Sequence, residues 1–231
     1  MFNHRLRLLF GLALGAALVG CGGGELASEL SMRPRPLPLP SGQRAVLDVP
    51  ADKPFSIALA PSSETPGLEG TAEADSHADA AGRADARVKA RRSGKASAEF
   101  QLGCSLKNDA DYQVEMTVRA RCAYTATLTL SPPRSSPDAQ LVLRLYARDY
   151  ANRLVRKDQL FLDTSEDGGG TAEGTVDVTF THILGPGEAI DIFFAGAATA
   201  DVKEGRSVEG SLELRDARMA ITTERARDLT P

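Results

Sequence analysis

Hydrophobic and polar residues alternate with a period of two along much of the chain beyond residue 83. In a first run, charged side chains occupy most of the odd positions. Small or apolar side chains occupy these even positions: Ala84, Ala86, Val88, Ala90, Ala96, Ala98, Phe100, Leu102 and Cys104. A second run keeps the same rule from Tyr112 to Leu130. A strand sends alternate side chains to opposite faces, whereas a helix would scatter these residues around its axis. Both runs are therefore predicted to be half-buried β-strands.

Shorter runs of the same kind follow, separated by residues typical of turns. They cover residues 141–147, 159–162, 175–183, 189–200 and 208–221. In the last run the inward-facing small and apolar residues shift from even to odd positions, which predicts a β-bulge near Asp216. Several short strands without helical patterns between them indicate an all-β fold, a two-sheet antiparallel β-sandwich that is jelly-roll-like by strand count.

The connection between the two long runs falls near Asn108-Asp109. If the runs paired as a simple hairpin, Cys104 would face a residue near Gln113. A bridge between Cys104 and Cys122 would then need bent strands or an arch between two sheets, and of these we favour the arch.

The first twenty residues follow a different pattern. His4, Arg5 and Arg7 precede an apolar run of thirteen residues, from Leu8 to Gly20. A membrane-spanning helix needs roughly 20 apolar residues, so a basic head followed by this shorter run indicates an export signal. The run ends in Leu18-Val19-Gly20-Cys21, which resembles the lipobox of bacterial lipoproteins.

This resemblance implies that Cys21 is lipidated, that residues 1–20 are removed, and that the new N-terminus is acylated, as with palmitate. Several acyl chains together hold a protein stably at a membrane. Gly22, rather than an acidic residue, follows the cysteine. In diderm bacteria this pattern resembles that of lipoproteins passed to the outer membrane, which would place the protein in the periplasm or at the cell surface.

The rest of the chain divides by composition. Residues 21–43 are predicted to form the lipidated cysteine and a Pro-rich tether, 44–83 short strands and a low-complexity segment, 84–223 the β-sandwich domain, and 224–231 a tail. Within the second of these, residues 61–83 resemble a disordered segment by composition but alternate like a strand. The final strand, Ser-x-x-Gly-Ser-Leu-x-Leu from Ser207, is similar to many exported bacterial sandwich domains.

With Cys21 lipidated, Cys104 and Cys122 remain as an even pair in an oxidising compartment. A disulfide between them is predicted, and it would stabilise the fold by about 3 kcal/mol. Two free buried thiols or a redox pair are the alternatives. The wide spacing lacks the close Cys-x-x-Cys geometry of redox cysteines.

Charge and composition argue against nucleic acid as a partner. Removal of residues 1–20 takes away two arginines and no acid, which leaves 25 basic against 31 acidic residues and a net charge of −6. Phosphate binding needs a clustered excess of Lys and Arg. A basic stripe from Arg83 to Lys95 could contact anionic lipid headgroups or an acidic polymer, but we favour its interpretation as the solvated outer face of one strand. The candidate outward aromatics, Tyr146, Tyr150 and Phe193, are too scattered in the sequence to predict a sugar-binding platform.

Candidate chemistry is sparse. The mature histidines, His77 and His182, are interpreted as surface or rim residues, and the chain has no Gly-x-Ser-x-Gly, Ser-x-x-Lys or His-x-x-x-His motif. Two acidic loops carry the oxygen ligands that calcium prefers, although acidic residues are also common in surface turns. Their candidate metal ligands are Asp109, Asp111, Asp163, Glu166 and Asp167.

The sequence thus favours a non-catalytic envelope lipoprotein, held at the membrane by lipid, that binds a protein or polysaccharide partner or has a structural role. The alternative is a hydrolase that acts on envelope or extracellular polymer through paired carboxylates. No cofactor is expected apart from the calcium possibility. The sequence does not indicate an oligomeric state.

Overall fold

The computed structural model describes residues 34–40, 44–132, 138–149, 151, 153–164 and 168–226, and this part of the chain is built from β-strands. The strands are β1 (Arg35–Pro36), β2 (Ala45–Val49), β3 (Ile57–Leu59), β4 (Ser62–Pro66), β5 (Thr71–Ala78), β6 (Ala84–Lys107), β7 (Val114–Ser131), β8 (Asp138–Asp149), β9 (Leu154–Thr164), β10 (Gly170–Leu184) and β11 (Ala189–Arg225). The described residues include no helix long and apolar enough to cross a membrane.

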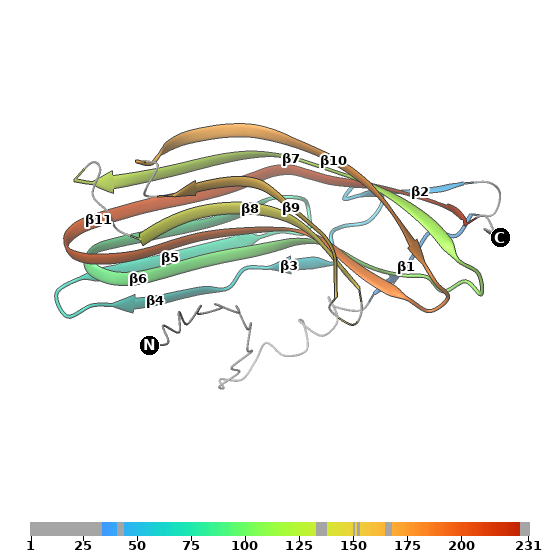
Figure 1. Ribbon diagram of the computed structural model, residues 1–231, viewed down its shortest axis with the longest axis horizontal. Helices are drawn as coiled ribbons and strands as arrows, with labels where there is room; N and C mark the ends of the chain where they lie inside the picture. The colour runs from blue at the N-terminus through green and yellow to red at the C-terminus, as the bar shows by residue number, and fades with distance from the viewer. Residues whose placement is uncertain are drawn as a thin grey trace, which may run out of the picture.

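Two long antiparallel strands, β6 and β11, organise the molecule. Their pairing runs from Lys107 opposite Ala189 to Ala84 opposite Leu214, and a register shift between Val202 and Arg206 interrupts it. Opposite this shift, Arg92 and Gly94 of β6 have positive φ angles of 63° and 154°. Both strands fold over at this point, as the turning ribbons of Figure 1 show. Each long strand therefore contributes one half to each of two sheets.

The first sheet contains β9, β8, the N-terminal half of β11 and the C-terminal half of β6. β1, β3 and β4 pair in succession along the outer edge of β6, and β1 is parallel to it. The second sheet contains β10, β7, the C-terminal half of β11 and the N-terminal half of β6. β5 pairs with β6 and β2 with β11 at the far edge of this sheet.

The core lies between the two sheets and is filled by the inward side chains of the alternating runs. Phe100, Leu102 and Phe194 from the first sheet and Met116 and Leu212 from the second are fully buried. The Cys104 Sγ atom lies 3.5 Å from the Met219 Sδ atom of the opposite sheet. The predicted all-β sandwich is therefore confirmed.

The sheets begin well before residue 84. The uncertain segment 61–83 contributes β4 and β5, both paired with β6, and Ala72 of β5 is buried. Residues Arg35–Pro36 of the predicted tether form β1, and the Leu37 side chain is buried beside it. The predicted signal sequence 1–20, Cys21 and the part of the predicted tail from residue 227 lie outside the described residues.

The connection from β6 to β7 is an arch, as predicted, because the two strands pair with β11 and not with each other. Asn108 is fully buried at this arch. Its Nδ2 atom donates to the carbonyl oxygens of Tyr112, Leu184 and Gly185, and its Oδ1 accepts from the Ala110 amide. One side chain thus ties this arch to the β10–β11 connection.

Candidate functional site

The outer surface of the second sheet carries a group of arginines at the end where β2, β11, β7 and β10 lie side by side. The even positions of β7 from Val114 to Cys122 are buried, so Arg119 and Arg121 at odd positions point outward. On β10, Asp177 is likewise exposed. We call this surface, with Arg44, Arg119, Arg121, Asp177 and Arg218, the arginine face.

A β-bulge brings Arg218 to this face. Just before the bulge the even positions of β11 from Val208 to Leu214 are buried, whereas after it Ala217, Met219 and Ile221 are buried and Arg218 is exposed. The register with β7 shifts between Arg215 and Arg218, and Asp216 has a φ angle of 52°. A bulge re-aims the side chains that follow it. The predicted bulge at Asp216 is therefore what turns Arg218 outward.

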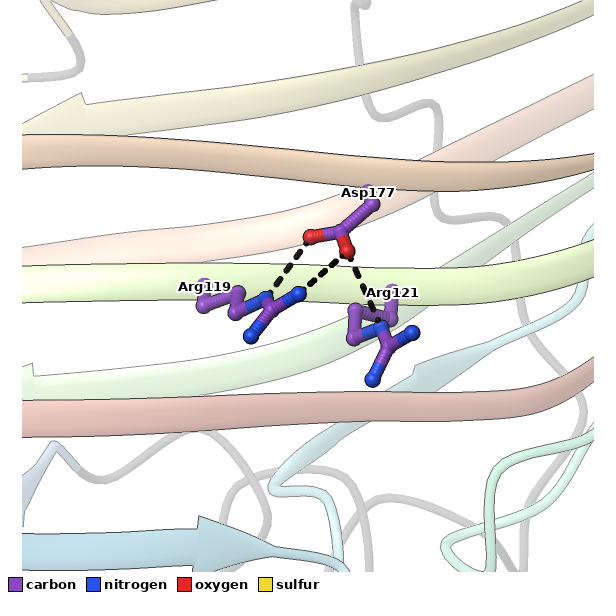
Figure 2. A network of polar contacts seen from close by, with 3 residues as sticks. All are labelled: Arg119, Arg121 and Asp177. Carbon is purple, nitrogen blue, oxygen red and sulfur yellow. Dashed lines mark hydrogen bonds and ion pairs between the residues drawn. The ribbon is translucent and has the colours of Figure 1, made fainter.

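The register places the charged side chains in one row across three strands. Asp177 of β10 is opposite Arg121 of β7, and Arg121 is opposite Arg218 of β11. Figure 2 shows how Asp177 holds both arginines of β7. The Arg119 Nε and Nη2 atoms donate to Oδ1 and Oδ2 of Asp177 at 2.8 and 2.6 Å, and the Arg121 Nε atom lies 3.3 Å from Oδ2.

The contacts between Arg119 and Asp177 shift the pKa values of both groups. The hydrogen bonds from Arg119 lower the pKa of Asp177 and, reciprocally, raise the pKa of Arg119. All three side chains remain open to solvent, with 53%, 58% and 39% of Arg119, Arg121 and Asp177 exposed. The network is thus ionised at neutral pH and accessible to a ligand.

The face is hollowed, and polar and apolar side chains both line it beside the arginines. Three hollows adjoin here: one of about 540 Å³ is lined by Arg119, Arg121 and Arg218, and it shares Arg119 with a second of about 560 Å³ and the other two arginines with a third of about 260 Å³. A row of hydroxyl groups continues the surface: Thr181, Thr117 and Thr222 are register partners, and the first two hydroxyls lie 3.2 Å apart. Asp48 and Asp216 line the rims of two hollows.

The expected disulfide is not formed, because Cys104 and Cys122 are free buried thiols. The register explains the difference. Cys104 pairs with Ile192 in the first sheet and points toward Met219 of the second, whereas Cys122 pairs with Val176. The alternation correctly predicted that both thiols point into the core. It could not show that a methionine fills the space beside Cys104.

The acidic loops do not come together as a metal centre in the described part of the chain. No group of three or more His, Cys, Asp or Glu side chains there could hold a metal ion. Asp109 pairs with the Lys107 Nζ atom at 2.8 Å, and Asp111 is exposed nearby. Asp163 lies on β9, while its loop partners Glu166 and Asp167 are outside the described residues, so the calcium prediction for that loop stays a prediction.

Two of the predicted outward aromatics meet on the first sheet. Tyr146 of β8 is opposite Phe193 of β11, with ring centroids 5.5 Å apart. The Arg148 guanidinium covers both rings at 5.0 and 5.5 Å, and Phe193 is only 4% exposed. The pair is a closed packing contact and not an open platform. Tyr150 lies outside the described residues.

The basic stripe on β6 is interleaved with acids. Lys89 has Glu73 and Glu209 as its register partners on the two neighbouring strands. Arg87 lies 3.3 Å from Asp85 and is opposite Asp75. This surface is therefore the charge-balanced outer face of a strand.

Sequence reasoning missed the arginine face. Arg119 and Arg121 stood on the predicted outer face of their strand, and the bulge that exposes Arg218 was visible as a break in alternation. Alternation shows on which face of its strand a side chain lies, however, but it does not show which strands lie next to that strand. The strands of this face lie far apart in the chain, so its assembly depended on a topology that the pattern did not specify.

No protein-family model and no curated protein matches the chain. Among solved structures, a family 35 carbohydrate binding module from Clostridium thermocellum is 10% identical, covers 80% of this chain and 100% of its own, and has a TM-score of 0.20. The CBM22-1 xylan-binding domain of Paenibacillus barcinonensis Xyn10C is 14% identical over 73% of this chain and 95% of its own, with a TM-score of 0.20.

A viral protein resembles the chain to a similar degree. The structure of the infectious bursal disease virus Gx strain is 12% identical, covers 95% of this chain and has a TM-score of 0.24. This chain spans 43% of the length of that viral chain. Likenesses at this level of identity and TM-score carry no argument about function. The function must be argued from the site itself.

Proposed function

We propose that this protein is a lipid-anchored envelope protein whose β-sandwich is a non-catalytic binding module for a polysaccharide. The observation that supports this proposal is the arginine face, an open, hollowed surface of guanidinium and hydroxyl groups on rigid strands. Guanidinium groups present several hydrogen-bond donors in fixed directions, and threonine hydroxyls both donate and accept. Such groups complement the hydroxyl-rich surface of a sugar chain.

The charged centre of the face and the hydroxyl groups beside it favour a polysaccharide over a protein partner. Arginine is also common at protein interfaces, but there it accompanies aromatic anchors that fill apolar pockets, and no aromatic residue that the structure describes lines the three hollows of the arginine face. Here the centre is formed by Arg119, Arg121, Arg218 and Asp177, with hydroxyl groups beside them. A ligand that supplies many polar groups matches this surface better.

The same geometry argues for binding rather than hydrolysis at this face. A glycosidase of the paired-carboxylate type needs one carboxyl group with a raised pKa to protonate the leaving oxygen. The Asp177 carboxylate is instead paired with two guanidinium groups, and the hydrogen bonds from Arg119 lower its pKa. It is suited to holding cationic side chains in place and not to donating a proton.

Affinity electrophoresis tests the binding role. The full-length chain, extracted in detergent, is run through native gels containing one of a panel of neutral or acidic polysaccharides. Retardation by at least one polysaccharide, relative to a gel without polymer, is expected. Unchanged mobility with every neutral and acidic polymer of the panel would contradict the proposal.

The anchor is tested separately, by expression of the full-length chain and of Cys21→Ser in a diderm bacterium. We expect the wild-type chain to incorporate a palmitate analogue and to sediment with membranes. The Cys21→Ser variant should do neither, because the only thiol of the Leu-Val-Gly-Cys segment is gone. Equal labelling of the two proteins would refute lipidation at this residue.

A further inference from the structure

The four arginines of the arginine face outnumber the one carboxylate among its defining residues, that of Asp177. Both oxygens of Asp177 are engaged by Arg119, and one of them also faces Arg121. Neither Arg218 nor Arg44 forms an ion pair within 4.0 Å with any residue that the structure describes. Both are exposed and line hollows next to the network. Their donors are thus directed to solvent.

The excess of positive charge is concentrated where two arginines lie side by side. Arg121 and Arg218 are direct register partners on adjacent antiparallel strands. The Cβ atoms of such partners lie about 5 Å apart, and like charges in this relation destabilise a sheet. Asp177 offsets the charge of Arg121 but not that of Arg218, because it lies beyond Arg121 and not between the two arginines. The rim acids Asp48 and Asp216 make no ion pair with either arginine in the described residues.

We propose that the polysaccharide bound by this protein is acidic, and that one of its oxyanions binds between Arg121 and Arg218. This inference rests on the proposed function and adds the chemical class of the ligand. A planar carboxylate matches the fork of a guanidinium group in a bidentate contact, and a sulfate ester offers similar oxygens. The bound oxyanion offsets the repulsion between the two arginines, and the neighbouring hydroxyl groups contact the adjacent sugar rings.

The experiment compares polymers that differ in charge and little else. Binding of the full-length protein to polygalacturonate, to fully methyl-esterified polygalacturonate, to dextran sulfate and to dextran is measured by affinity electrophoresis. The variants are Arg121→Gln and Arg218→Gln, each checked by its melting temperature. Arg87→Gln is the matched control, because it removes the same charge from the outer face of the same sheet but from a position beside Asp85.

We expect retention by polygalacturonate or dextran sulfate, and binding at least about tenfold weaker in Arg121→Gln and Arg218→Gln, the loss expected for one charge-assisted hydrogen bond. Arg87→Gln should bind like the wild type. Retention by only one of the two acidic polymers would tell whether the site accepts a carboxylate or a sulfate.

Other outcomes separate this inference from the proposed function. Equal retention by the acid and by its methyl ester, or an equal loss in all three variants, would overturn the oxyanion site while leaving a polysaccharide-binding role in place. Full binding by both Arg121→Gln and Arg218→Gln would do the same. Failure of every polymer to retain the protein would overturn both.

Discussion

Cys104 and Cys122 are held in the protonated form by their surroundings. Burial raises the pKa of each thiol to about 12, from an ordinary value of 9.0. A thiolate would have to form among apolar side chains, where the charged form is poorly solvated. Both residues therefore act as small core residues, and neither is a reactive thiol in the folded protein.

This burial predicts a loss of stability at alkaline pH. The folded thiols begin to lose their protons only as the pH approaches 12, whereas those of the unfolded chain lose theirs around pH 9. Their contribution to stability is complete below pH 9 and falls as the pH rises toward 12, because the unfolded state then binds fewer protons. Urea unfolding of the wild type and of Cys104→Ala/Cys122→Ala across this range should show a shallower decline in the double variant. Parallel curves would contradict the assigned pKa shifts.

The alternation of residues was sufficient to predict most individual strands. β6, β7 and the bulge at Asp216 follow directly from which positions are apolar. β5 could not be decided, since Ala72, Ala74 and Ala78 combine strand-like alternation with the poor strand propensity of alanine. Its pairing with β6 fixes it in the folded protein.

The continuity of β11 could not be predicted either. Glu204-Gly205 resembles a turn, so the sequence suggests two strands, over 189–200 and 208–221. In the structure the pairing with β6 resumes at Arg206, and Gly205 has a φ angle of 74°. Whether a glycine ends a strand or bends it depends on its partner strand, which a local pattern does not contain.

The connections between the sheets depend on Asn108. In Asn108→Ala, three carbonyl oxygens and the Ala110 amide lose their buried partner. A buried polar group left without a partner costs about 1–3 kcal/mol, so we expect the free energy of unfolding to fall by at least that much in chemical denaturation. Asp109→Ala is the control, because its exposed carboxylate pairs with Lys107 alone, and it should change stability by less than about 0.5 kcal/mol. Equal effects of the two substitutions would show that the Asn108 hydrogen bonds contribute little.

At the scale of the whole molecule, the two sheets share their central strands. β6 and β11 each pass from one sheet to the other at the fold-over near Gly94 and Gly205, and a single hydrophobic core lies between the halves. Neither sheet can lose its central strands without disrupting the other. The molecule should therefore unfold as one unit, although a sandwich of two separate sheets could in principle lose one first.

Phe194→Ala tests this coupling. The Phe194 ring is fully buried in the first sheet, between its register partners Leu102 and Leu145. Its truncation should cost about 3–5 kcal/mol, whereas Leu154→Ala, at a 56% exposed position of the same sheet, should have little effect. Hydrogen exchange followed by mass spectrometry then reports each sheet separately. Because the long strands are shared, protection should fall by a similar factor in β7 and β10 of the second sheet as in β8 of the first. Loss of protection in the first sheet alone would show that the fold-over uncouples the two halves.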